Sequence, residues 1–148
     1  MRHVALACNP FTFWGDATAQ RDAAETATER FHLKLDLNQF DSIYQATDPD
    51  FRHASPKKDT DVLWRMVQTR FGSLQSDTLL GWNVNFTPAN GTVVNLVYRT
   101  TFSKNIATET FTWRIRNGKA ALLGYNINSP ALLRAMMDEK SATETGKN

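Results

Sequence analysis

Glu109 is the residue of this chain whose type and position could do chemistry. It lies in the segment 107–115, where large apolar residues alternate with threonines at the spacing of a β-strand. Because successive strand side chains point to opposite faces, Glu109 shares a face with Phe111 and Trp113. A carboxylate among aromatic rings either accepts structural hydrogen bonds or lines a pocket, where it could act as a general base.

The register of the last hairpin decides which side chains meet Glu109. The sequence Arg116-Asn117-Gly118-Lys119 suits a two-residue turn or a three-residue turn with a glycine bulge. The three-residue turn keeps every large apolar residue on one face, where each contributes about 1.5–3 kcal/mol on burial. We therefore predict the bulged turn, which pairs Trp113 with Ala121, Phe111 with Leu123 and Glu109 with Tyr125.

These neighbours define a candidate site. Tyr98 and Thr100 alternate onto the same face from the preceding strand. In one hypothesis Tyr98, Thr100, Glu109 and Tyr125 line a ligand pocket, with Glu109 as general base and Tyr125 orienting the substrate. In the other, Glu109 is held by a structural hydrogen bond to Tyr125 and a helix residue. An open cavity beside Glu109 would favour the first hypothesis, and a filled interior would favour the second.

The remaining reactive residues are scattered, and we expect no metal and no cofactor. No HxH or HxxxH pattern unites His3, His32 and His53, so all three are predicted to lie at the surface. Four aspartates surround the start of the third predicted helix without the spacing of a calcium loop. They are Asp48, Asp50, Asp59 and Asp61. A glycine-rich phosphate loop and a Gly-x-Ser-x-Gly motif are both absent from the sequence.

Cys8 is the single cysteine and follows a short apolar stretch. A lone cysteine excludes an intrachain disulfide and a multi-cysteine metal site within these residues. The run Met1 to Cys8 is similar to the end of a bacterial lipoprotein signal, in which small residues precede a cysteine that becomes lipidated. Its apolar segment, Val4–Ala7, is shorter than the usual length of about 7–15 residues. A free cysteine in a frayed terminus is the alternative.

Composition indicates one globular domain. The 148 residues are 41% hydrophobic and 22% charged, with 17 basic and 15 acidic side chains and a net charge of +2. The basic residues form no cluster, which argues against a nucleic-acid partner. No apolar run is long enough to span a bilayer.

Apolar periodicity predicts helices before a curved four-stranded antiparallel sheet, packed on its apolar face, and one short helix after it. Four consecutive antiparallel strands occupy Leu79 to Ile127, the first with Leu80, Trp82, Val84 and Phe86 on its apolar face. The expected helices span about 16–35, 40–44, 55–71 and 129–137, with Pro56 and Pro130 near helix starts. The predicted domain organisation is a signal remnant or linker (1–15), a single cone-shaped α+β domain (16–137) and a disordered tail (138–148).

Several short segments resemble the nuclear transport factor 2-like or cystatin-like cone fold, and more narrowly a family of small uncharacterised bacterial envelope proteins, many of them lipoproteins. They are Phe31, Phe40-x-x-Ile43-Tyr44, Asp50-Phe51-Arg52, Gly81-Trp82-Asn83, Thr108-Glu109-x-Phe111 and Leu123-Gly124-Tyr125-Asn126-Ile127-Asn128. The resemblance covers residues 17–133 and implies a curved sheet wrapped around the first helix. In such cones the open end often binds a small molecule, and copies often pair through the outer sheet face.

We therefore predict a non-catalytic binding or accessory domain of the cell envelope or periplasm, tethered through Cys8 if that residue is lipidated. A small-molecule enzyme with Glu109 as general base is the alternative function, and the cytoplasm is the alternative location. The expected partner is a small molecule or an envelope protein. Arg99 and Arg114, on the outer sheet face, are either solvated or part of a weak homodimer surface.

Overall fold

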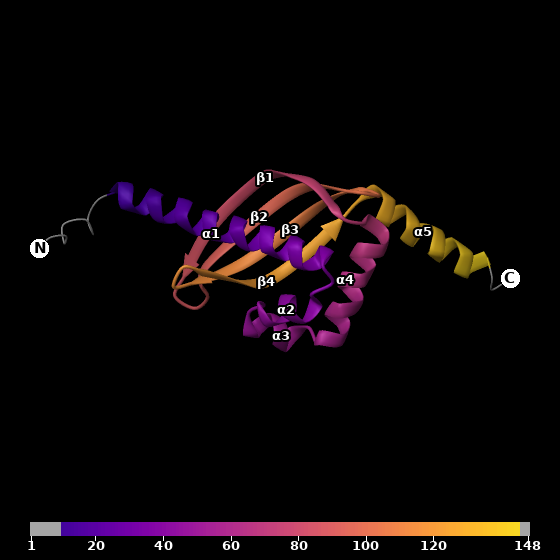
Figure 1. Ribbon diagram of the computed structural model, residues 1–148, viewed down its shortest axis with the longest axis horizontal. Coiled ribbons are helices and arrows are strands. Elements are labelled where there is room, and N and C mark those ends of the chain that lie inside the picture. The colour runs from indigo at the N-terminus through magenta and orange to yellow at the C-terminus, as the bar shows by residue number, and fades with distance from the viewer. Residues whose placement is uncertain (1–9, 146–148) are drawn as a thin grey trace, which may run out of the picture.

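The computed structural model describes residues 10–145 and confirms an α+β fold, with helices before a four-stranded antiparallel sheet and one helix after it (Figure 1). The strand order is β1-β2-β3-β4, so each strand pairs with its neighbour in the chain. The elements are α1 (Pro10–Asp36), α2 (Phe40–Gln45), α3 (Pro49–Ala54), α4 (Lys57–Phe71), β1 (Leu74–Thr87), β2 (Gly91–Phe102), β3 (Ile106–Arg116), β4 (Lys119–Asn128) and α5 (Pro130–Thr145).

The core lies between α1, α4 and one face of the curved sheet, which we call the inner face. α1 crosses that face and contacts all four strands (Figure 1). Its buried residues recur at helical spacing: Ala24, Thr28, Phe31, His32 and Leu35. The Phe31 ring meets the edges of Trp64 from α4 and Phe111 from β3, each at a centroid distance of 5.2 Å.

The β3–β4 turn differs from the predicted one. Asn117 and Gly118 both have positive φ values, 53° and 74°, as a two-residue type I′ turn requires. Trp113 consequently pairs with Leu122 and not with Ala121. The prediction was wrong because it placed the bulge in the turn, although Asn-Gly adopts the two-residue geometry without strain.

A bulge inside β4 then restores the apolar register. The pairing shifts by one residue at Leu123, so that Phe111 lies opposite Tyr125 and Glu109 opposite Ile127. Leu122 and Ile127 are therefore both buried, although an odd spacing along a regular strand would place their side chains on opposite faces. The large residues thus stay on the inner face, but the bulge that keeps them there lies within β4 and not in the turn.

β1 contains a bulge at Leu80, where the pairing with β2 shifts by one residue. Leu79 therefore packs against the core and Leu80 is exposed, which reverses the predicted arrangement of these two residues. Beyond the bulge Trp82, Val84 and Phe86 lie on the inner face, as their alternation predicts.

Three helix boundaries also differ from the prediction. α3 was not expected, although Asp48 caps it by accepting a hydrogen bond from the Asp50 amide at 2.9 Å and Pro49 opens its first turn. α1 already begins at Pro10, inside the predicted linker, and Cys8 lies outside the described residues. α5 continues past Met137 to Thr145, because residues 138–145 are mostly compatible with helix even though they are polar.

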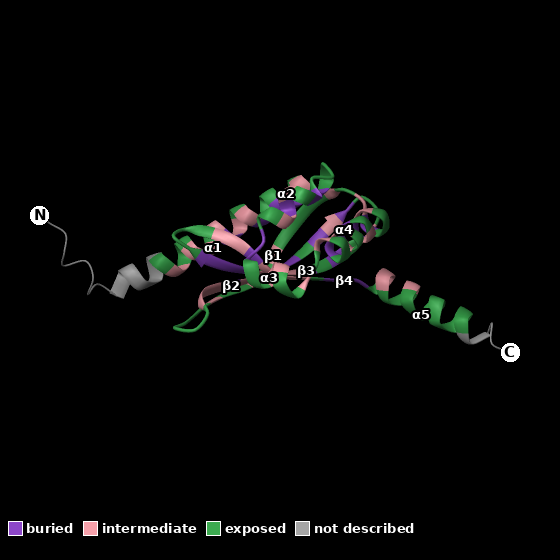
Figure 2. Cartoon of the chain, turned by 90° about the horizontal axis from the view of Figure 1, so that it is seen from below, coloured by how far each residue is buried: buried purple, intermediate pink, exposed green. Residues whose placement is uncertain are grey.

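α5 extends away from the domain and is mostly exposed (Figure 2). Within residues 10–145 no helix combines the length and hydropathy that a membrane span requires.

Candidate functional site

Glu109 lies at the centre of a buried hydrogen-bond cluster on the inner face. Its Oε1 atom accepts a hydrogen bond from the Thr100 hydroxyl at 2.7 Å and lies 2.7 Å from Nε2 of His32. Its Oε2 atom accepts from the Tyr125 hydroxyl at 2.5 Å. The Glu109 side chain has no solvent exposure. Both of its oxygens are thus satisfied by three elements, α1, β2 and β4.

His32 is the partner that the sequence analysis placed wrongly. It was predicted to lie at the surface, but it is only 2% exposed, because it follows Phe31 on the buried stripe of α1. Its Nε2 atom faces Glu109, and its Nδ1 atom lies 3.8 Å from Oδ2 of Asp77, a residue at the rim of the sheet. A protonated His32 would therefore sit between two carboxylates.

Burial also affects the two tyrosines of this region. Burial raises the pKa of the Tyr125 hydroxyl well above its ordinary value, and the neighbouring Glu109 carboxylate raises it further. Burial likewise raises the pKa of Tyr98, whose phenol lies near the acidic residues of α1. Both tyrosines are therefore neutral hydrogen-bonding groups at physiological pH.

The four predicted pocket residues lie together, and hydrogen bonds join three of them, Thr100, Glu109 and Tyr125. Tyr98 and Glu109 are cross-strand partners, and Thr100 and Tyr125 bind the same carboxylate. A general base must reach a proton of the substrate within hydrogen-bond distance, directly or through one water. The enclosed Glu109 makes protein contacts instead, so the geometry favours the structural alternative.

A second polar cluster ties the α2–α3 connection to the sheet. Arg114 donates hydrogen bonds to Asp48 and Asp50, each at 2.8 Å, and Arg116 donates to the other Asp48 oxygen at 3.0 Å. Arg114 was predicted on the solvated outer face, yet it is only 6% exposed. Its guanidinium group lowers the pKa of the Asp50 carboxyl through a hydrogen bond and its charge. This arrangement anchors a loop and leaves no free charge.

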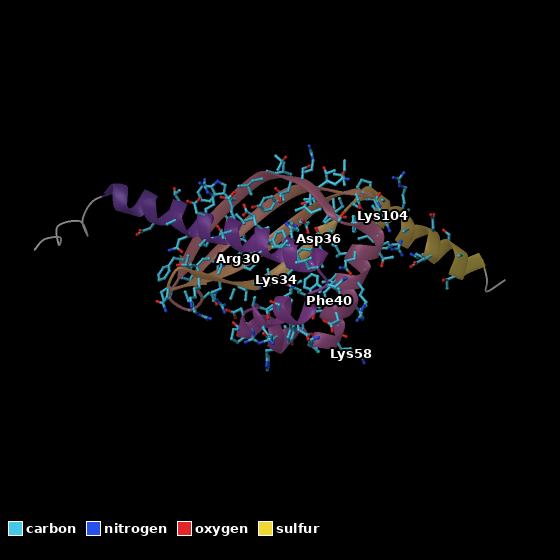
Figure 3. The ribbon with its side chains drawn as sticks, viewed as in Figure 1. Arg30, Lys34, Asp36, Phe40, Lys58 and Lys104 are labelled. Carbon is cyan, nitrogen blue, oxygen red and sulfur yellow. The ribbon has the colours of Figure 1, made fainter. Side chains whose placement is uncertain are left out.

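A cavity of about 100 Å³ opens between α1, α2 and the β3–β4 hairpin, with Phe31 as one of its walls. Its walls are mostly apolar, from Phe31, Ile43, Trp113 and Leu122. Its polar lining residues are two cations of α1, Arg30 and Lys34, which occupy neighbouring turns. Figure 3 labels both on the side of α1 that faces α2.

The cavity continues into a wider surface hollow along α1. The two spaces share Ala27, Arg30 and Ala120, and the second reaches the β3–β4 turn at Gly118 and Lys119. Among the described residues, Arg30, Lys34 and Lys119 form no ion pair and no side-chain hydrogen bond, although Asp22 lies at the far end of the hollow. Two positive charges without a protein partner among residues 10–145, Arg30 and Lys34, therefore border the apolar cavity, and a third, Lys119, borders the adjoining hollow.

Neither the two cations nor the cavity was predicted from the sequence. At ordinary helical spacing, cations such as Arg30 and Lys34 usually belong to the solvated face of an amphipathic helix. Their only sequence signal is the absence of an acidic residue three or four positions away from Arg30. Within residues 10–145 the side chains form no group of three or more His, Cys, Asp and Glu residues that could hold a metal.

Comparison of the chain with protein-family models, with curated proteins and with solved structures gives no match.

Proposed function

We propose that the protein is a non-catalytic binding domain for a small molecule with an apolar body and an anionic group. The observation that carries this proposal is the pair of unpaired cations, Arg30 and Lys34, at the rim of the apolar cavity. An apolar cavity with a few converging polar groups is the usual form of a ligand site. The unmatched positive charge favours an anion as the polar part of the ligand.

The apolar walls set the size of the enclosed part of the ligand. Phe31 and Trp113 offer ring surfaces, and Ile43 and Leu122 offer aliphatic ones. A space of about 100 Å³ is small beside the ~300–1,000 Å³ of drug-sized sites. The ligand therefore buries only a short aliphatic chain or a single ring, and its remaining part lies in the hollow toward Lys119.

An anionic group fits the two cations of α1 better than a neutral one. Arg30 and Lys34 lie four positions apart on one helix face, where two like charges repel each other. A carboxylate or phosphate between them would remove this repulsion and accept charge-assisted hydrogen bonds from both. The expected ligand class is thus a short organic acid or an organic phosphate ester.

The enzyme hypothesis has less support. Its general base, Glu109, has no solvent exposure and three protein partners. The cavity with free charges is lined by other residues and holds cations rather than an acid–base pair. Binding without chemistry is therefore the function that these observations favour.

Isothermal titration with octanoate, octanol and octylamine tests the proposal, with the three compounds matched in chain length. We expect octanoate to bind and the neutral and cationic analogues to bind more weakly. Lys34→Gln should weaken octanoate binding about tenfold, the effect of losing about 1.4 kcal/mol. Lys58→Gln, a change of an exposed lysine on α4 that is far from the cavity lining (Figure 3), is the control.

Two outcomes would contradict the proposal. Equal binding of the three compounds would remove the role of the anion, and no binding by any of them or by benzoate and phenyl phosphate would remove the cavity as a site. Ala46→Leu, at an exposed position of the cavity lining, should narrow the entrance and weaken binding without unfolding the protein.

We also propose that the protein works in the bacterial cell envelope. The support is the run of small residues before Cys8 and the resemblance of the sequence to envelope lipoproteins, and the curved sheet around α1 is compatible with the cone fold of that group. Expression of the gene with its upstream region, followed by labelling with a palmitate analogue, tests this location. Labelling that is lost in Cys8→Ser supports it, and unlabelled protein in the cytosolic fraction contradicts it.

A further inference from the structure

The two edge strands of the sheet, β4 and β1, differ in whether another part of the chain bonds to their backbone. At the β4 edge the α2–α3 connection adds a parallel bridge between Thr47 and Leu122. The Asp48 amide donates to the Leu122 carbonyl at 2.8 Å, and the Leu122 amide donates to the Ala46 carbonyl at 3.3 Å. At the other edge, no strand among residues 10–145 lies beyond β1, and Figure 1 shows this edge uncovered.

The C-terminal half of the free edge, Gly81–Thr87, lacks the features that normally prevent strand pairing. Soluble proteins protect an edge strand with charged side chains, proline, shortness or a bulge. β1 is 14 residues long, and its segment Gly81–Thr87 contains no charge, no proline and no bulge. In that segment, Gly-Trp-Asn-Val-Asn-Phe-Thr, the strand-favouring Trp82, Val84 and Phe86 alternate with uncharged Asn83 and Asn85.

Two aromatic side chains beside this edge remain exposed. Trp82 is 40% and Phe86 is 70% exposed, and both belong to the inner face of β1. The guanidinium carbon of Arg21 lies 4.9 Å from the centroid of the Trp82 ring, which holds that ring from the α1 side. Trp82, Val84 and Phe86 also border an open hollow against the N-terminal half of α1.

We propose that two copies of the chain pair antiparallel through their β1 edges, with Val84 on the two-fold axis. In this register Trp82 of each copy lies opposite Phe86 of the other, and Asn83 lies opposite Asn85. The contact therefore contains two aromatic cross-strand pairs on the inner face and two amide pairs on the outer face. No like charges meet, because the paired segments are uncharged.

The register is specific to this centre. Pairing centred one residue away, on Asn83 or Asn85, would place Trp82 or Phe86 opposite a residue of the other copy that is not aromatic. The self-complementary pattern thus favours a second copy over a different protein as the occupant of the edge. An edge contact of this length lies at the small end of specific interfaces, so the dimer should dissociate on dilution.

The dimer is independent of the proposed ligand site. The cavity lies on the β4 side of the sheet, with Leu122 and Ala120 in its lining, whereas the contact uses β1. Both copies would keep their cavities open. The contact also differs from the outer-face dimer that the sequence suggested, since it uses the edge of the sheet.

Sedimentation velocity over a concentration series measures the oligomeric state. We expect the wild type to shift from the 16.7 kDa chain mass at low concentration to twice that mass at high concentration. Phe86→Lys should remain monomeric throughout, because it puts charge on the free edge. Val62→Lys, at a position of α4 that is 61% exposed, is the matched control and should still dimerise. Circular dichroism and thermal melting confirm that each variant is folded.

Cysteine cross-linking then tests the register in a Cys8→Ser background. Val84→Cys should form an intermolecular disulfide under mild oxidation, because the two positions face each other across the axis. Leu80→Cys should not, because two copies of that residue would be separated by about eight residues of strand, roughly 27 Å. A wild type that is monomeric at all concentrations, a dimer that persists in Phe86→Lys, or equal cross-linking of both cysteine variants would overturn the proposal.

Discussion

Glu109, which faces α1 from β3, and Arg30, which belongs to α1, differ in their partners. The fold surrounds the first charge with hydrogen bonds and leaves the second without a protein partner within residues 10–145. Glu109 is enclosed, with hydrogen-bond donors from α1, β2 and β4 at 2.5–2.7 Å. Arg30 borders an apolar cavity and, among the described residues, forms no ion pair. A hydrogen-bonded interior charge indicates a structural role, whereas an exposed charge without a protein partner beside a hollow is free to meet a ligand.

Glu109 is therefore a weaker candidate for a ligand-binding residue than the sequence indicates. A lone carboxylate on an apolar strand face is the more conspicuous feature of the sequence, because burial of a charge is costly. The surrounding residues show that His32, Thr100 and Tyr125 offset that cost. The less conspicuous cations of α1, at ordinary helical spacing, are the ones left without partners.

The largest effect is expected for Glu109→Ala. The substitution leaves His32, Thr100 and Tyr125 buried without their common acceptor, which should lower the free energy of unfolding by about 3–5 kcal/mol. Urea denaturation followed by circular dichroism measures the change, with Lys58→Ala as the surface control. Unchanged stability together with lost octanoate binding would reverse the assignment of roles.

Arg114→Ala should cost less, about 1–3 kcal/mol. It removes one of the cations from Asp48, which is fully buried, while Arg116 and the Asp50 amide remain. Arg99→Ala, an exposed arginine of β2, is the matched control. If both variants are equally stable, the second cluster does not anchor the α2–α3 connection.

Alkaline pH should destabilise the interior through Tyr98 and Tyr125. Because the folded pKa of each phenol lies above the ordinary value of 10.0, the stabilising contribution is complete below pH 10 and is lost as the pH rises toward the folded pKa. Each tyrosine should contribute a slope of about 1.4 kcal/mol per pH unit in that window. Urea denaturation at a series of alkaline pH values measures the slope of the unfolding free energy against pH. Tyr98→Phe should remove the part of this slope that Tyr98 contributes.

The smallest effect is expected for Arg30→Gln. Removing a like-charge neighbour of Lys34 should raise the free energy of unfolding by about 0.2–0.5 kcal/mol, while octanoate binding falls. Thermal melting and titration of the same preparation measure the two changes. A loss of stability instead would mean that Arg30 has a structural partner and that the contrast with Glu109 fails.

Most of the fold follows from local pattern. Alternation along 79–127 predicts the antiparallel sheet, and the Ser-Pro steps at 55–56 and 129–130 predict helix starts close to those observed. The helix after Asp48-Pro49 was missed because these residues were interpreted only as the end of the second helix, although α2 already ends at Gln45 and Asp48 instead caps α3. The bulges at Leu80 and Leu123 depend on contacts between elements, which single-strand alternation does not contain.

The site was less predictable for a similar reason. His32 is buried because the buried stripe of α1 includes Thr28 and His32, whereas Ala27 is only partly buried against the core. Trp113 was expected in the core, and its indole indeed donates to Thr28 at 3.0 Å. The cavity arises where α1, α2 and β4 meet, and no one of these segments encodes that meeting point alone.

The capped β4 edge has a further consequence for how the protein assembles. A sheet with two open edges could add copies without limit and grow into a filament. Here the chain segment from Ala46 to Asp48 occupies the backbone groups of Leu122 at one edge. A copy that joined through β1 would therefore offer the next copy a β4 edge on which the Leu122 backbone groups are already bonded, which disfavours growth beyond two copies.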